Sequence, residues 1–333
     1  MAETKIQWAS YTFNPWIGCT KVAPGCTNCY AEAFAKRYNK AVWGPRGTRV
    51  KTSTKYWQQP LRWNREAEAA GERRRVFCAS LADVFEDWDG DIVDSQGRLL
   101  IPYGEDPDCP ASTLSMDDLG RDLFALIDAT PHLDWLLLTK RPENVLRMWT
   151  WHKVPGHVRQ NEGDGYHRDY RANVWLGCSV SEQATADENI PKLLKCRDLC
   201  PVLFLSCEPL LSNINLEANR IGIRPWHSEP WLGGIAWVII GGESGPHARP
   251  CHLRWIRDIL QQCRDAGVAP FVKQLGANVY DDAEPSELAV AVAESMGGLN
   301  VSALRRLRLK DKKGGDMSEW DEDLRIREFP NVT

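Results

Sequence analysis

The 333-residue sequence predicts a fold in which strands and helices alternate, as a parallel α/β sheet or a (β/α) barrel. Short apolar runs rich in Val, Ile, Phe and Leu recur along the chain, and amphipathic helical patterns lie between them. Polar side chains follow these apolar runs. In (β/α) barrels the active site is built from such side chains at the carboxyl ends of the strands.

The predicted strands are too short for buried helices and show little alternation, so both of their faces should be covered. Six runs are of this kind: RVFCAS (75–80), LDWLLLTK (133–140), NVWLGCSV (173–180), PVLFLSCE (201–208), AWVIIGGE (236–243) and APFVKQLG (269–276). The short apolar opening KIQWASYTF (5–13) precedes them and is expected to hold the first strand.

Helical patterns separate the strands, and several carry start or stop signals. They cover residues 31–40, 115–131, 141–149, 181–196 and 252–267. Pro142 suits the first turn of a helix, Pro131 ends one, and Gly267 closes the last.

Three connections are longer than usual and could each form a lid over a site. They cover residues 84–113, 149–172 and 212–235, and we expect them as insertions in a barrel of residues 1–276. The histidines of the second insertion fit no zinc-ligand spacing, which favours a solvated loop. Residues 277–333 are expected to pack on the barrel as a C-terminal extension.

Composition favours a cytoplasmic protein. No run of eighteen apolar residues occurs, and the N-terminus has no apolar core of a secretory signal. Although the net charge is only −4, residues 1–75 carry fourteen basic and five acidic side chains, whereas 81–135 carry fourteen acidic and two basic ones. The basic region also contains Tyr38, Trp43, Tyr56, Trp57 and Trp63, so it could bind a polyanion such as nucleic acid.

The polar strand ends are the candidate active-site residues. If the strands are regular, side-chain parity places Lys140, Glu208 and Glu243 on the interior face, and Cys78 shares a face with Ser80. The same alternation predicts that the side chains of Cys178 and Cys207 lie on the outer face of the sheet, packed against the helices.

Three of the eleven cysteines, Cys19, Cys26 and Cys29, lie within eleven residues. In a reducing compartment an odd cluster is a poor disulfide site. Zinc usually takes two ligand pairs, although three cysteines with an open position remain a possible catalytic zinc site. Three thiolates can also hold an iron–sulfur cluster with one iron left open, to which S-adenosylmethionine can bind.

The cysteine loop precedes the first helix, and at this point a resemblance is visible. The chain resembles radical S-adenosylmethionine enzymes, whose cysteine loop follows the first strand of a partial (β/α)6 TIM-type barrel. Their usual spacing is C-x3-C-x2-C, and the spacing here is C-x6-C-x2-C. More closely, the blocks FNPWIGCTKVAPGCTNCYA, FCASLADVF, LLLTKRPEN, LSCEPLL and FVKQLG are similar to those of a phage- and bacteria-borne family of three-cysteine, radical-SAM-like proteins of undetermined function.

The resemblance implies a [4Fe–4S] cluster on Cys19, Cys26 and Cys29, with S-adenosylmethionine and an external electron donor. It also implies contacts to S-adenosylmethionine or substrate from the strand ends. The candidates for binding are Ser80, Asp83, Ser179, Ser181, Gly241, Gly242 and Arg249, and those for catalysis are Lys140, Glu208, Glu243 and Cys78.

The leading hypothesis is therefore a radical S-adenosylmethionine enzyme acting on an anionic substrate, such as a nucleobase in DNA during repair or modification. One alternative is a zinc-stabilised module that binds nucleic acid. Another is a non-catalytic barrel that serves a methyltransferase-like partner protein.

Overall fold

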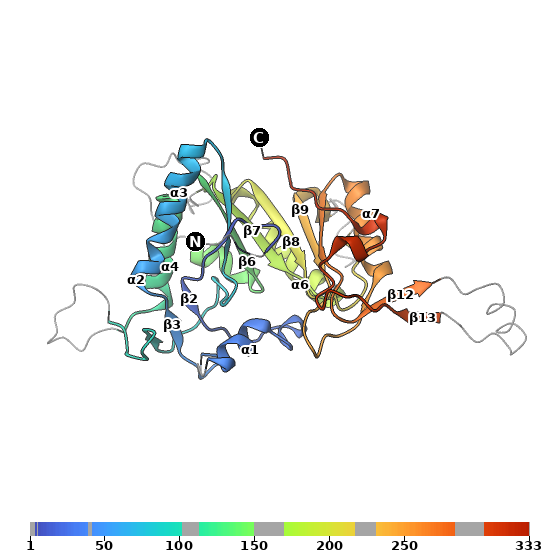
Figure 1. The fold of residues 1–333 in the computed structure, drawn as a ribbon. Helices are drawn as coiled ribbons and strands as arrows, with labels where there is room; N and C mark the ends of the chain where they lie inside the picture. Colours follow the sequence, from blue (N-terminus) through green and yellow to red (C-terminus); the bar gives the residue numbers. More distant parts are fainter. Residues whose placement is uncertain are drawn as a thin grey trace, which may run out of the picture. The chain divides into compact units, whose positions relative to one another are not determined.

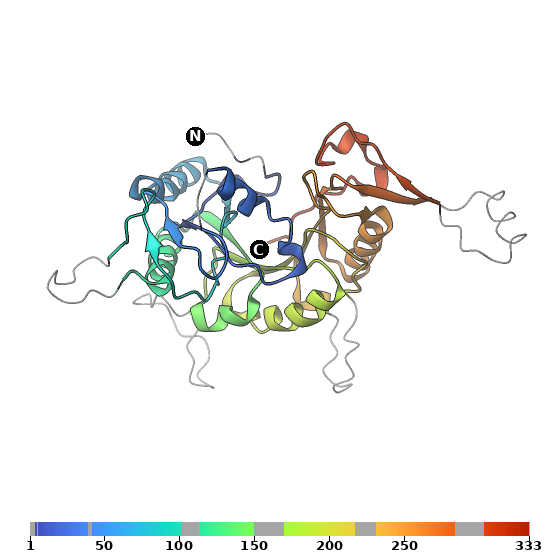
Figure 2. The same ribbon diagram turned by 90° about the horizontal axis from the view of Figure 1, so that it is seen from below.

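The computed structural model describes residues 4, 6–38, 42–101, 113–149, 170–216, 231–283 and 303–332. The chain forms two compact units. Unit 1 comprises Met1–Ser179, Asp187–Leu205 and Asn331–Thr333, and unit 2 comprises Val180–Ala186 and Ser206–Pro330. Figures 1 and 2 show the ribbon from two directions.

The main sheet has seven strands in the order β1-β4-β6-β7-β8-β9-β11, which is also their order along the chain. The strands are β1 (Tyr11–Thr12), β4 (Arg74–Cys78), β6 (Leu133–Thr139), β7 (Val174–Ser179), β8 (Val202–Cys207), β9 (Trp237–Gly241) and β11 (Ala269–Gln274). The pairs β1/β4, β4/β6, β6/β7 and β9/β11 are parallel. The predicted α/β class is confirmed, and this strand order is that of an incomplete (β/α) barrel. It has seven strands, one for each of the six apolar runs and one in the opening segment, which is one more than the six of the (β/α)6 barrel implied by the resemblance.

Helices connect these strands, as predicted. They are α1 (Tyr30–Arg37), α2 (Thr54–Trp57), α3 (Gln59–Ala70), α4 (Met116–Asp128), α5 (Pro142–Met148), α6 (Gln183–Leu194) and α7 (Leu253–Ala266). Helix α4 begins with a capping box, in which Ser115 and Asp118 each bond the other's backbone N–H. Gly267, in the left-handed conformation at φ 67°, ends α7. Helices α2 and α3 were not predicted.

A second sheet in unit 1 joins β2 (Trp16–Ile17), β3 (Arg49–Lys51) and β5 (Ile92–Val93) in the order β2-β3-β5. A small core forms around Ala35, Val42, Val50 and Val93. Val84, Phe85, Glu86 and Ile92 are also buried. The first part of the predicted insertion 84–113 thus contains buried side chains and the short strand β5. Its residues 102–112 lie outside the described part.

The aromatic residues of the basic N-terminal region mostly belong to the core of unit 1. Trp63 is buried and stacks on Tyr11, with ring centroids 4.3 Å apart. Phe13 contacts the rings of Tyr56 and Trp57 at 5.1 and 5.5 Å. Tyr38, by contrast, is exposed. Most of these rings are thus occupied by packing, and their presence in the sequence gives little support for polyanion binding there.

In unit 2, α7 lies against strands β9 and β11 (Figure 1). Its apolar side chains Leu253, Ile256, Ile259 and Leu260 are buried. A third sheet has the order β10-β12-β13 and contains β10 (Cys251–His252), β12 (Val279–Ala283) and β13 (Ala303–Arg306). The chain after β13 carries two buried anchors, Trp320 and Leu324. Much of the insertions 149–172 and 212–235 lies outside the described residues. No described helix is long and apolar enough to cross a membrane.

Candidate functional site

The three clustered cysteines lie between the first strand of the main sheet, β1, and helix α1. Cys19 follows β2, Cys26 ends a short 3-10 helix, η1 (Pro24–Cys26), and Cys29 immediately precedes α1. All three thiols are free and partly exposed. We call residues 18–30 the cysteine loop.

The backbone around Cys19 is fixed by hydrogen bonds to two other segments. Gly18 N–H donates to the carbonyl of Leu81 at 3.0 Å, and Gly44 N–H donates to the carbonyl of Cys19 at 2.9 Å. Gly18 has φ 123°, and a Cβ there would come within 2.8 Å of Arg49 Cδ. Only glycine suits this position, because the backbone is in a region that side chains disfavour and Arg49 passes close to it.

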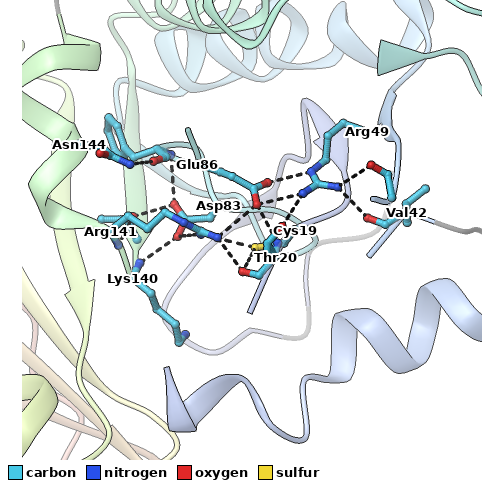
Figure 3. Close-up of polar contacts among 12 residues, drawn as sticks. Cys19, Thr20, Val42, Arg49, Asp83, Glu86, Lys140, Arg141 and Asn144 are labelled. Atoms are coloured by element: carbon cyan, nitrogen blue, oxygen red, sulfur yellow. Dashed lines mark hydrogen bonds and ion pairs between the residues drawn. The ribbon is translucent and has the colours of Figure 1, made fainter. Parts of the chain in front are cut away.

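Thr20, the residue after Cys19, is held through all of its polar groups (Figure 3). Its N–H donates to Glu86 Oε1 at 2.7 Å, and its carbonyl accepts from Arg141 at 2.6 Å. Its hydroxyl accepts from Arg49 at 2.9 Å. Three charged side chains from separate segments therefore fix this single residue.

Arg141 also reaches the sulfur of Cys19. Its Nη1 lies 3.6 Å from Cys19 Sγ and 2.9 Å from Asp83 Oδ2, while Nη2 lies 3.2 Å from Glu86 Oε1. Asp83, Glu86 and Arg141 are all buried. Such ion pairs are retained only where close geometry and further hydrogen bonds offset the loss of hydration.

Asp83 is a junction between the ends of two neighbouring strands of the main sheet. Its Oδ1 accepts from the Thr139 hydroxyl at 2.7 Å and from Phe85 N–H at 3.1 Å. Its Oδ2 accepts from Lys140 N–H at 3.0 Å, besides Arg141. Each oxygen thus accepts two hydrogen bonds from the protein itself. Through its bond to Arg141, which contacts Cys19 and Thr20, this carboxylate helps to hold the cysteine loop. We call Arg49, Asp83, Glu86 and Arg141 the buried charge network.

These charges also set the protonation of the Cys19 thiol. Burial, followed by the charges of the Asp83 and Glu86 carboxylates, raises the pKa of Cys19 to about 12, although Arg141 acts in the opposite direction. Burial disfavours the charge of Arg141, but Asp83, Cys19 and Glu86 outweigh that effect and raise its pKa.

The other end of the cysteine loop is fixed at the end of strand β4. The Tyr30 hydroxyl, one residue after Cys29, donates to the carbonyl of Ser80 at 2.7 Å. The Ser80 side chain is in turn bonded to the Asn14 amide at 3.2 Å. Ser80 was predicted from the sequence as a binding residue, and here it ties the loop to the sheet.

The remaining predicted residues of unit 1 lie near this region or in the core. Cys78 is fully buried, and burial raises its pKa well above the ordinary thiol value. Ser179 is also buried. The side chain of Lys140 points away from the charge network, although its N–H is bound to Asp83 (Figure 3).

The predicted residues of unit 2 form contacts of their own. Glu208 pairs with Lys273 at 2.9 Å. Glu243 binds Arg249 through both of its oxygens, at 2.6 and 3.0 Å. The buried Ser181 donates its N–H to Thr185 Oγ1 at 2.9 Å.

Gly241 and Gly242 leave room for neighbouring groups. A Cβ on Gly241 would lie 2.7 Å from Glu208 Oε1, and one on Gly242 would overlap the carbonyl of Leu275. Close packing therefore explains both glycines without a bound ligand.

The thiols provide a donor set that suits a soft metal or an iron–sulfur cluster, and their partial exposure leaves them accessible. In this structure they do not converge: within the described residues, no three His, Cys, Asp or Glu side chains are close enough to hold a metal ion.

Sequence reasoning missed Thr20, Arg49 and Glu86. Arg49 lies in a short strand, and Glu86 looks like one acid among the many of residues 81–135. The only local indication of this site in the sequence was Gly18, since a glycine can mark a place where another group passes close to the backbone.

One protein family matches most of the chain. Its model, described as "Protein of unknown function (DUF5131)", covers residues 3–95 and 113–322. No curated protein and no solved structure matches the chain.

Proposed function

The chain belongs to the DUF5131 family, and from its cysteine loop we propose that it is an iron–sulfur enzyme that uses S-adenosylmethionine. Cys19, Cys26 and Cys29 would hold a [4Fe–4S] cluster with one open iron. When bound, such a cluster supplies the electron for radical cleavage of S-adenosylmethionine. An external donor would have to provide that electron.

The observation that carries this proposal is the buried support of Cys19. Burying charges is expensive unless each of them is paired and hydrogen-bonded. Here Arg49, Glu86 and Arg141 are buried, and all three bind the residue that follows Cys19. A loop that served only as a connection would gain nothing from holding one cysteine so rigidly.

The two ends of the loop contribute differently to ligand binding. Cys19 is held next to Arg141, whose N–H can donate to a ligating sulfur and so stabilise its negative charge. Cys26 ends the 3-10 helix that begins at Pro24, and Cys29 is the N-cap residue of α1. The enlarged first gap of the C-x6-C-x2-C motif covers residues 20–25 and ends in the first two residues of this 3-10 helix, Pro24 and Gly25.

We further propose an anionic substrate, such as a nucleobase within a nucleic acid. Lys140 supports this choice, because its side chain leaves the charge network while its backbone is fixed by Asp83 (Figure 3). A lysine in this arrangement offers a positive charge near the strand ends. The basic side chains of residues 1–75 support the same substrate class.

Anaerobic reconstitution of the full chain with iron and sulfide tests the proposal. We expect about four irons per chain, and 5′-deoxyadenosine after addition of dithionite and S-adenosylmethionine. Cys26→Ala and Cys29→Ala should each lose most of the iron. Cys263→Ala, which removes a buried thiol from α7, should retain it.

The same samples distinguish the proposal from its rivals. A colourless protein that retains one zinc per chain after purification would favour the zinc-stabilised module. Equal iron content in all three cysteine variants would contradict the assignment of the cluster to this loop.

A further inference from the structure

Unit 2 contains a second surface that the cysteine loop does not involve: the sheet β10-β12-β13 and the chain that follows it. The register of this sheet aligns His252 of β10 with Tyr280 of β12, and Tyr280 with Arg306 of β13. Residues directly opposite each other share one face of a sheet. One face therefore carries an imidazole, a phenol ring and a guanidinium side by side.

Three aromatic rings cluster here, with His252 in contact with both of the others. The ring centroids of His252 and Tyr280 are 5.7 Å apart with an interplanar angle of 23°, and Trp255 lies 4.3 Å from His252. None of the three rings is fully buried. Partly exposed flat rings of this kind provide surfaces on which nucleic-acid bases stack.

A dense group of positive charges begins in β13, where Arg306 lies on this face and Arg305, aligned with Asp281, lies on the other. Between residues 305 and 313 the chain has six basic side chains and a single acid, Asp311. All six basic residues are exposed. Within the described part of the chain, no hydrogen bond or ion pair engages the charged groups of Arg305, Arg306, Arg308, Lys310, Lys312 and Lys313. We call residues 305–313 the basic segment.

The backbone of the basic segment is fixed, even though its side chains are free to bind. Leu307 N–H donates to the carbonyl of Val279 at 2.9 Å, which extends the pairing beyond β13. The Glu319 carboxylate accepts from the N–H groups of Lys310 and Asp311 at 2.7 and 2.9 Å. Gly276 N–H donates to the carbonyl of Lys313 at 3.2 Å.

This rigidity favours binding, because a surface that is already ordered loses little conformational entropy when a ligand binds to it. The only acid of the segment is also engaged. The Asp311 carboxylate accepts from the N–H groups of Lys313 and Gly315, at 3.2 and 2.6 Å. Both oxygens of this carboxylate therefore accept hydrogen bonds from backbone N–H groups, and not from the basic side chains.

From these observations we propose that the face formed by His252, Trp255, Tyr280 and the basic segment binds single-stranded nucleic acid. The arginines and lysines contact successive phosphates, and the rings stack on unpaired bases. A duplex keeps its bases stacked on each other, so it can use only the phosphate contacts. This inference goes beyond the enzymatic proposal, since binding at this face requires neither a cluster nor S-adenosylmethionine.

Fluorescence anisotropy with the full chain tests the inference. The probes are labelled oligonucleotides of about 20 nucleotides, as single-stranded DNA, single-stranded RNA and duplex DNA of one sequence. We expect binding of a single strand that weakens as salt rises, and weaker binding of the duplex. Comparison of the DNA and RNA strands shows which of the two the protein prefers.

The triple variant Arg306→Ala, Arg308→Ala, Lys310→Ala should bind the strand at least about tenfold more weakly. Its slope of log K against log salt should fall by about 2, since each phosphate contact to a single strand contributes about 0.7. The matched control Arg98→Ala, Arg121→Ala, Lys195→Ala removes the same charge from exposed positions elsewhere and should bind within about twofold of the wild type.

Tyr280→Ala isolates the stacking contribution. It should weaken single-strand binding by about fivefold or more while leaving the salt slope unchanged. The inference is overturned by wild-type protein that binds no strand at low salt, by equal losses in the two triple variants, or by a Tyr280→Ala variant that binds like the wild type. Equal affinity for duplex and single strand also overturns it.

Discussion

At the scale of single residues, Arg49 is the most heavily engaged side chain of the buried charge network. Its guanidinium forms two hydrogen bonds with Glu86, at 2.8 and 3.0 Å, and one with Thr20. The backbone carbonyls of Val42, Gly47 and Thr48 accept its remaining N–H groups at 3.3–3.4 Å. It also stacks on Trp88, 4.3 Å from the ring centroid. A planar group with five donors is required to satisfy all of these partners.

Arg49→Lys should therefore destabilise the protein although the charge is conserved. Lysine has three donors and no planar face, so Glu86 and several carbonyls would lose partners in a buried environment. We expect a loss of about 3 kcal/mol in the free energy of unfolding, measured by urea denaturation.

Arg62→Lys is the control for this substitution. Arg62 is exposed and pairs with Glu66 along helix α3, where an ion pair contributes less than about 0.5 kcal/mol. A loss of stability in Arg49→Lys no larger than in this control would show that the charge network does not depend on guanidinium geometry.

The sequence was informative about some residues of the site and silent about others. Close spacing identified Cys19, Cys26 and Cys29 as a group, and the position after a strand identified Asp83. Arg49 and Glu86 could not be found in this way, because they are 37 positions apart and meet only in the folded chain. The sequence also suggested ligand-binding roles for Asp83 and Ser80, whose contacts in the structure support the loop.

At the scale of elements, the strands of the main sheet after β1 were predictable to within two or three residues. Burial on both faces leaves uninterrupted apolar runs, which are visible in the sequence. The strands of the sheet β2-β3-β5 have only two or three residues each, too few to show a period. Helix α3 was missed because its mixed composition, QPLRWNREAEAA, shows no wide apolar face.

The packing of β7 against β8 depends on a residue without a side chain. A Cβ on Gly177 of β7 would overlap the ring of Phe204 of β8, and this ring is fully buried. Gly177→Ala should lower the free energy of unfolding by about 1–3 kcal/mol, because a packed core resists added volume. Urea denaturation measures the loss.

Two further variants test the cause of that loss. Phe204→Leu introduced with Gly177→Ala should recover part of the stability, which gives a favourable coupling in the double-mutant cycle. Gly233→Ala, where a Cβ would meet no atom within 4 Å, should change stability by less than about 0.5 kcal/mol. Purely additive effects of Gly177→Ala and Phe204→Leu would contradict the proposed overlap.

At the scale of the whole molecule, several protein groups from distant parts of the chain hold Cys19 in place. The charge network and the hydrogen bonds of Gly18 and Gly44 fix it with protein groups alone. A structural zinc site behaves differently, since there the metal supplies much of the folding energy.

Metal removal should therefore leave the fold intact. After reconstitution, treatment with a chelator under air should abolish the iron while the far-UV circular dichroism and the urea midpoint stay unchanged. Unfolding of the chain on chelation would instead favour the zinc-stabilised alternative. Arg49→Lys, treated in the same way, shows whether a weakened network makes the fold dependent on metal.

The contact between Arg141 and Cys19 also determines when the site can form during protein synthesis. The two residues are 122 positions apart, and Arg49, Asp83 and Glu86 lie between them in the sequence. Contacts of such long sequence separation form late, because a large loop must close first. A ribosome-bound chain that ends before Arg141 carries all three cysteines without the group that holds the first of them. The surroundings of Cys19 can thus be completed only after strands β1 to β6 and helices α1 to α4 have been synthesised. The proposed metal cofactor would enter this finished geometry after that stage, although its three ligands are among the first residues of the chain to be made.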